Sequence, residues 1–122
     1  MRAFEDDDFV FGHTEYYFAS RRIGFEVFRF EDGHAVEHWE NIQARKGPNA
    51  AGRSMVDGPV EATDLDLTEQ NRAIVRSFAE TVLFGGRLDQ LAEYIGAAAF
   101  ADHNPRLTGD VTALRAALEA MK

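Results

Sequence analysis

Apolar and polar residues alternate along the first third of the chain in the manner of half-buried strands. Residues 9 to 18 are rich in aromatic and β-branched residues, which favours a strand. Asp32-Gly33 is the strongest short hairpin signal in the chain, because both central residues of a type I′ turn need positive φ and these two tolerate it. The pattern predicts three strands in succession over residues 9 to 43.

The hairpin sorts its side chains onto two faces if its pairing is regular. Phe30 then pairs with Ala35, Val27 pairs with His38, and neighbours along each strand alternate between the faces. One face carries Ile23, Phe25, Val27, Arg29, Val36, His38, Glu40 and Ile42, and the other carries Glu26, Phe28, Phe30, Ala35, Glu37, Trp39 and Asn41. We expect one face to line a core or pocket and the other to pack on another sheet or subunit.

The second half of the chain has helical spacing. Ile74, Phe78 and Val82 follow a helix-start box at Asp66-Leu67-Thr68-Glu69, and Gly85-Gly86 ends the run, so we expect a helix over about 67 to 84. A second, shorter helix is predicted at Leu88, Leu91, Ala92 and Ile95, and a last one from Asp110 or Thr112. Strands followed by helices indicate an α+β fold with helices on one face of an antiparallel sheet.

One domain over residues 1 to 122 is expected, with strands in 1 to 43 and helices in 65 to 122. Residues 44 to 64 between them are rich in glycine and proline, which indicates a linker or an ordered loop. Three strands make a thin sheet. We therefore expect that Phe100–His103 supplies another strand or that a second chain completes the sheet.

Composition narrows the class of protein. The chain has 122 residues, of which 45% are hydrophobic, enough for one ordinary core. Cysteine is absent, which excludes disulfides and thiolate chemistry, and a net charge of −8 argues against nucleic-acid binding. No apolar run suits a membrane span or a signal peptide, so we expect a cytoplasmic protein. Asp6-Asp7-Asp8 is interpreted as a solvated turn rather than a metal site.

Four segments together resemble the SnoaL-like polyketide cyclases of the nuclear transport factor 2-like superfamily. The hairpin ending in Glu37-His38-Trp39-Glu40 is similar to the closing hairpin of this family, and residues 9 to 16 to the strand before it. Residues 71 to 95 with His103-Asn104-Pro105 are similar to its opening helices and first strand. Family members usually begin with the helices, so the resemblance implies a circularly permuted order, with helices closing on their own sheet or on a neighbouring chain's sheet.

The resemblance implies a curved sheet wrapped by helices into a cone, with an apolar pocket on its concave side. A carboxylic acid at the position of Glu40 serves these cyclases as general acid/base in an aldol ring closure, without metal or organic cofactor, although the family usually has Asp there. The implied ligand is a small apolar carbonyl compound. The implied catalytic residues are Glu40 and His38, and the implied substrate-binding residues are His13, His103, Asn104, Phe25, Val27 and Arg29.

Structural interpretations of the same residues stay open. Glu40 also suits a surface strand end, His13 a hydrogen-bonded core position, and His103-Asn104 an ordinary turn before proline. For Arg29 an ion pair is favoured over a ligand contact. Histidines with a carboxylate can bind zinc or iron, but their spacing predicts no approach, so no metal is expected.

Trp39, Phe28 and Phe30 are expected to form a homodimer interface, because an exposed aromatic patch of that size is unusual on a monomer. Three hypotheses for function remain. The first is a small-molecule enzyme with cofactor-free acid/base chemistry, of the aldol cyclisation or isomerisation type. The second is a non-catalytic module of the same fold that binds a ligand or dimerises, and the third is a structural partner protein whose pocket is filled by side chains.

Overall fold

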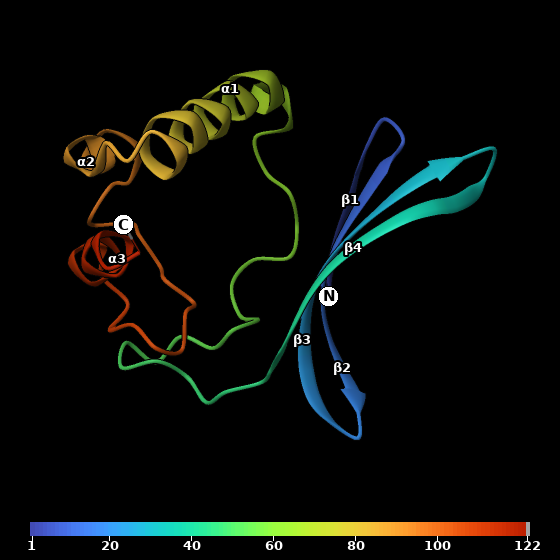
Figure 1. Cartoon of the computed structure of the whole chain (residues 1–122), viewed down its shortest axis with the longest axis horizontal. Helices are drawn as coiled ribbons and strands as arrows, with labels where there is room; N and C mark the ends of the chain where they lie inside the picture. Colours follow the sequence, from blue (N-terminus) through green and yellow to red (C-terminus); the bar gives the residue numbers. More distant parts are fainter. Residues whose placement is uncertain (122) are drawn as a thin grey trace. The chain divides into compact units, whose positions relative to one another are not determined.

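The computed structural model describes residues 1–121, apart from the side chain of Phe18. It is an α+β structure in which four strands come first and the helices follow (Figure 1), which confirms the predicted fold class at this level. Two compact units divide the chain. The first comprises Met1–Gly47 and Ser54–Val60, and the second comprises Pro48–Arg53 and the chain from Glu61 onward. The single SnoaL-like domain stays a prediction.

The first unit is built on one antiparallel sheet with the strand order β1-β2-β3-β4. Its strands are β1 (Arg2–Asp6), β2 (Phe9–Phe18), β3 (Ser20–Glu31) and β4 (His34–Ala44). The three strands predicted over residues 9 to 43 are confirmed, and β1 adds a fourth. Phe100–His103, where a further strand was expected, has no strand structure. Its Asp102 carboxylate instead accepts the backbone N–H of Asn104 at 2.8 Å, a local turn that competes with strand pairing.

The tight turns that join the strands contain residues with positive φ, at Asp7, Ala19, Asp32 and Gly33. Asp32 and Gly33 have φ values of 50° and 76°, as the predicted type I′ turn between β3 and β4 requires. Asp7, with a φ of 50°, occupies the turn between β1 and β2. Asp7 and Asp8 of the acidic run therefore form a turn, as predicted, while Asp6 ends β1.

Beyond the hairpin turn the pairing departs from the regular register. Phe30 pairs with Ala35, but Arg29 pairs with Glu37, so Val36 is an extra residue in β4. Such a β-bulge displaces every later pair by one residue. The predicted register is therefore wrong beyond Ala35. Residues of β4 after the bulge lie on the opposite face from the one expected, relative to β3.

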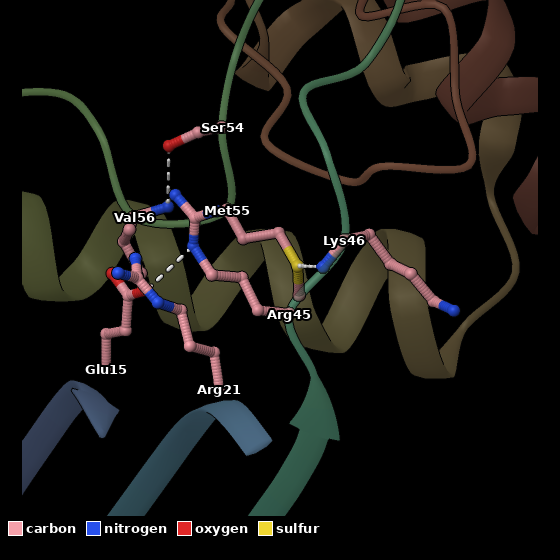
Figure 2. A network of polar contacts seen from close by, with 7 residues as sticks. All are labelled: Glu15, Arg21, Arg45, Lys46, Ser54, Met55 and Val56. Carbon is pink, nitrogen blue, oxygen red and sulfur yellow. Dashed lines mark hydrogen bonds and ion pairs between the residues drawn. The ribbon is translucent and has the colours of Figure 1, made fainter. Parts of the chain in front are cut away.

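The chain after β4 is ordered against the sheet (Figure 2). Met55 is 6% exposed, and its Sδ accepts a hydrogen bond from the backbone N–H of Lys46 at 3.2 Å. The Arg45 guanidinium forms an ion pair with Glu15 of β2 at 2.7 Å. The sequence left open whether residues 44 to 64 form a linker or an ordered loop. This part of the segment is an ordered loop.

Arg2 fastens the same loop to β1. Its guanidinium donates hydrogen bonds to four consecutive backbone carbonyls, those of Val56, Asp57, Gly58 and Pro59, at 3.3, 2.6, 3.0 and 2.9 Å. The five N–H donors of a guanidinium form a rigid fork that can satisfy several acceptors at once. One side chain thus holds four consecutive residues of the loop at the start of β1.

The second unit holds the helices. They are the 3-10 turn η1 (Leu65–Leu67), α1 (Thr68–Phe78), the π-helical turn η2 (Ala79–Phe84), the 3-10 turn η3 (Leu88–Gln90), α2 (Leu91–Tyr94) and α3 (Val111–Glu119). Continuous α1 and η2 confirm the helix predicted over about 67 to 84. The expected capping box is wrong, because the N-cap is Leu67 and the Thr68 hydroxyl instead donates to the carbonyl of Leu65 at 2.8 Å. Asp110 caps α3, as predicted, by accepting the N–H of Ala113 at 2.9 Å.

The core of the second unit lies where these helices meet. Val82, Leu88 and Leu91 are buried in it. The residues packed around them are Phe78, Tyr94, Ile95, Val111 and Leu118. Ile74, expected on the buried stripe, is 47% exposed. The core therefore forms at the C-terminal end of the long helix rather than along its whole length.

Asn49 anchors residues 48–53 to the second unit. It is 7% exposed, and its Nδ2 donates to the backbone carbonyl of Asp102 at 2.7 Å. Its Oδ1 accepts the backbone N–H groups of Ala51 and Arg53 at 3.1 and 3.0 Å. The amide thus closes the loop on itself and ties it to the segment around Asp102.

None of the helices within residues 1–121 combines the length and the apolar character that crossing a membrane requires. The cytoplasmic location stays a prediction.

Candidate functional site

The observed register gives the sheet two distinct faces. We call the side that carries the acid/base cluster the polar face. It holds Thr14, Tyr16, Arg22, Glu26, Phe28, His38, Glu40 and Ile42. We call aromatic face the opposite side, which holds Phe4, Phe9, Phe11, His13, Phe25, Val27 and Trp39. Both sets follow from cross-strand pairing, because directly opposed residues share a face.

A hollow of about 440 Å³ lies on the polar face, lined by Tyr16, Arg22, Glu40 and Ile42. The strands bring these residues together from distant positions. Tyr16 of β2 lies directly opposite Arg22 of β3, and Glu40 and Ile42 come from β4 on the other side of β3. A phenol, a guanidinium and a carboxylate therefore share one hollow with an apolar side chain.

Gly24 makes room for this cluster in the middle of β3. It is buried, and a Cβ at this position would lie 2.7 Å from Oε1 of Glu26 and 3.1 Å from Oγ1 of Thr14 and from Cε1 of Tyr16. Any larger residue would push these side chains apart. Glycine inside a strand often marks such a close approach.

Burial and two carboxylates favour the protonated form of the Tyr16 phenol. Burial, followed by the carboxylates of Glu26 and Glu40, raises the pKa of Tyr16 above its ordinary value of 10.0, while Arg22 opposes the shift. Thr14 in turn donates a hydrogen bond from its hydroxyl to Glu26 at 3.3 Å. Tyr16 is thus an O–H donor at neutral pH, placed beside two carboxylates.

His38 and Glu40 share the polar face, as predicted, because they are two residues apart on one strand. The imidazole of His38 stacks on Phe28 with ring centroids 4.1 Å apart and planes 3° apart. Both His38 and Glu40 are exposed. The stack orients the imidazole on the face that also carries Glu40.

The remaining candidates on the sheet lie on the aromatic face. His13 stacks on Phe25 with centroids 4.3 Å apart, and Val27 and Arg29 follow Phe25 on the same side of β3. The expectation that these residues share a face with Glu40 is wrong in the observed register. The cause is the bulge at Val36, which turns Glu40 to the opposite face.

Arg29 forms ion pairs, which agrees with the interpretation favoured from the sequence. Its guanidinium contacts the carboxylates of Glu37 and of Glu31. The hydrogen bond to Glu37 raises the pKa of Arg29 above its ordinary value. The partner is Glu37 rather than Glu40 because the bulge places Glu37 opposite Arg29.

The aromatic patch expected at Trp39, Phe28 and Phe30 does not form as one surface. Trp39 lies on the aromatic face opposite Val27, with its ring centroid 6.3 Å from that of Phe9. Phe28 lies on the polar face beneath His38. The displaced register is again the physical reason.

His103 and Asn104 belong to the second unit. The Asn104 side chain accepts the backbone N–H of Arg106 at 3.0 Å, which closes a turn around Pro105. This agrees with the structural alternative for His103-Asn104, an ordinary turn next to proline. A contribution of either residue to a ligand site stays a prediction.

Within the part of the chain that the structure describes, no group of three or more His, Asp or Glu side chains is arranged to hold a metal ion. Comparison of the chain with protein-family models, with curated proteins and with solved structures gives no match.

Sequence reasoning missed Tyr16, Arg22 and Glu26. Their side chains join the site only through the pairing of β2 with β3 and of β3 with β4. One local signal was available, since Gly24 interrupts an otherwise strand-forming run. A glycine inside a strand indicates a position where side chains of the neighbouring strands approach closely.

Proposed function

We propose that the hollow on the polar face binds a small carbonyl compound and that Glu40 moves a proton within it. The observation that carries the proposal is the convergence of Tyr16, Arg22, Glu40 and Ile42 on one hollow of about 440 Å³. Its volume suits a small molecule. Its lining combines a candidate base, two candidate groups for an oxygen atom and an apolar wall.

The chemistry proposed is proton transfer next to a carbonyl, without a cofactor. The Glu40 carboxylate takes a proton from the carbon beside the carbonyl, and the electron pair of the C–H bond moves to the carbonyl oxygen as an enolate. Tyr16 donates a hydrogen bond to that oxygen, and Arg22 offsets its charge. The proton on Glu40 then returns to the product, to an alcohol oxygen after an aldol closure or to another carbon in an isomerisation.

The pKa of Tyr16 fits this role. An oxyanion donor has to stay protonated at the working pH, and the two carboxylates near Tyr16 favour its neutral form. His38, stacked on Phe28, is proposed to position Glu40 or the substrate rather than to transfer the proton itself. The residues are thus proposed to act as a base, an oxygen-binding pair and a positioning group.

The resemblance to SnoaL-like cyclases supports the same proposal. It implies that helices cover the concave side of the sheet in a cone, and that the chain order is permuted. The α+β class, with strands before helices, is compatible with that order.

A second candidate function is an interaction module of the same fold without turnover. The observation that favours it is the exposure of Phe4, Phe9, Phe25 and Trp39 on the aromatic face, at 62, 42, 39 and 49%. Contiguous exposed aromatic groups are typical of contact surfaces. The homodimer expected through the sheet would, in this structure, use the aromatic face, with Trp39 but without Phe28.

Hydrogen–deuterium exchange at the carbon next to a ketone tests the enzyme proposal without knowledge of the natural substrate. Aryl methyl ketones and linear diketones are incubated with the protein in D₂O and followed by NMR. We expect E40Q to lose about 10²-fold or more of the exchange rate while ketone binding is retained. E5Q, an exposed strand position with the same change of charge, is the control and should match the wild type.

The outcomes separate the two functions. Binding of a ketone without exchange in the wild type would support the interaction module and exclude proton transfer. Equal exchange in the wild type and E40Q would remove Glu40 from the chemistry.

A further inference from the structure

β4 is a long and exposed edge strand. It is the last strand of the sheet and pairs only with β3. All of its 11 residues, His34–Ala44, are exposed. Proline, charged side chains (above all lysine), β-bulges or a covering segment commonly protect edge strands from pairing with another chain. Of these, β4 has the bulge at Val36 and the charges of Glu37 and Glu40. His34–Ala44 contains neither proline nor lysine.

We propose that β4 pairs in antiparallel fashion with β4 of a second copy of this chain, with Trp39 opposite Trp39 on the two-fold axis. Two four-stranded sheets then form one continuous sheet. The proposal is carried by the sequence of the edge strand together with its exposure. It concerns assembly and does not depend on the proposed function.

Charge complementarity selects this register. With Trp39 at the centre, His38 of each copy lies opposite the partner's Glu40, and Glu37 lies opposite the partner's Asn41. Opposite charges across antiparallel strands stabilise pairing, whereas like charges destabilise it. Two imidazole–carboxylate pairs form, and no carboxylate faces another.

Apolar residues match in the same register. Val36 lies opposite the partner's Ile42, and these two residues are 45 and 42% exposed in the single chain. Pairing would shield four such side chains, two from each copy. The bulge at Val36 ends the regular ladder there, so hydrogen-bonded pairing is proposed between Glu37 and Asn41 of both copies.

Neighbouring registers lack these matches. Centring the pairing on Glu37 or on Glu40 sets identical carboxylates opposite each other. Centring it on His38 buries Glu40 against the partner's Val36. The register centred on Trp39 therefore combines both kinds of complementarity.

The pairing would also change the candidate site. Directly opposed residues share a face, so the partner's His38 would lie across from Glu40 on the polar face. Each hollow would then have an imidazole from the other copy beside its carboxylate. On the opposite side, the two aromatic faces would join at Trp39.

Sedimentation velocity of the full chain tests the assembly, with activity playing no part in the measurement. We expect a dimer at about 100 µM, a concentration that detects a weak interface. H38E sets two carboxylates opposite each other twice per dimer and should raise the dissociation constant about tenfold or more. H38E/E40H restores opposite partners and should recover the dimer. H34E, the same substitution outside the register, should leave dimerisation unchanged.

A crosslink locates the interface independently of charge. The chain has no cysteine, so W39C introduces a single thiol on the proposed two-fold axis, and mild oxidation should produce a covalent dimer. The thiol of Q43C would lie opposite the partner's Ala35 and far from the equivalent thiol in the other copy. This variant should therefore crosslink poorly. Circular dichroism confirms that both variants are folded.

A monomeric wild type at that concentration would overturn the proposal. A dimer that survives H38E and crosslinks no better through W39C than through Q43C would also overturn it, because the interface would then lie elsewhere, for example on the aromatic face.

Discussion

Replacing Asn49 with alanine tests whether the loop after β4 is a structural part of the second unit. The substitution removes one hydrogen bond to the carbonyl of Asp102 and two from the backbone N–H groups of Ala51 and Arg53. Asn49 is 7% exposed, so water replaces these bonds poorly. At about 0.5 to 1.5 kcal/mol for each bond, the free energy of unfolding should fall by about 2 to 4 kcal/mol.

Urea unfolding followed by helical circular dichroism measures this loss, because the helices belong to the same unit as Asn49. For a urea dependence of about 1 to 3 kcal/mol per M, the midpoint should fall by about 1 M or more. N71A, at an exposed position of α1, is the matched control, and its change should stay within about 0.5 kcal/mol. An N49A variant as stable as N71A would refute the reasoning.

Two further predictions concern the sheet. The chain has no cysteine, so pairs of new cysteines test the register. F28C/H38C should form an intramolecular disulfide readily and F28C/E37C should not, because Phe28 lies opposite His38. Preferential bonding of F28C/E37C would instead support the regular register. The pKa of Tyr16 should lie above 10.0. Its loss of a proton is followed by the near-ultraviolet phenolate signal that Y16F lacks. E40Q should lower the pKa of Tyr16, because it removes one carboxylate. Since the raised pKa belongs to the folded state, the stability it contributes is present below pH 10.0 and is lost as pH rises through the folded-state pKa; a Tyr16 signal at or below pH 10.0 would contradict this.

Local patterns predicted the elements well. Alternation located β2, β3 and β4, the Asp32-Gly33 pair gave the turn between β3 and β4, and Gly85-Gly86 ended the long helical run. Each of these signals lies within a few neighbouring residues. The conformational preferences of the side chains act over that same distance.

The bulge at Val36 could not be predicted in the same way. A bulge inserts one residue without a required sequence signature, yet the strand period of two means that one residue changes the face of everything that follows. The sequence therefore predicted correctly that His38 and Glu40 share a face. It predicted wrongly which residues of β3 share that face with them.

Contacts between residues far apart in the sequence could not be predicted from the local sequence patterns either. The four carbonyls that accept hydrogen bonds from Arg2 lie more than 50 residues away in the chain, at Val56–Pro59. The same holds for Asn49 and Asp102. Both contacts convert a glycine- and proline-rich segment, whose composition indicates a loop, into a fixed part of the structure.

The bulge also links the candidate site to the proposed assembly. Without the extra residue at Val36, regular pairing would turn Glu40 toward Phe25 on the aromatic face, and the hollow beside Tyr16 would lose its carboxylate. With it, His38 and Glu40 project together from the polar side of an exposed edge strand. The same alternation that aims Glu40 at Tyr16 and Arg22 makes the strand complementary to itself about Trp39. One inserted residue thus decides which chemistry the polar face can hold and on which face of the sheet a partner's His38 would lie.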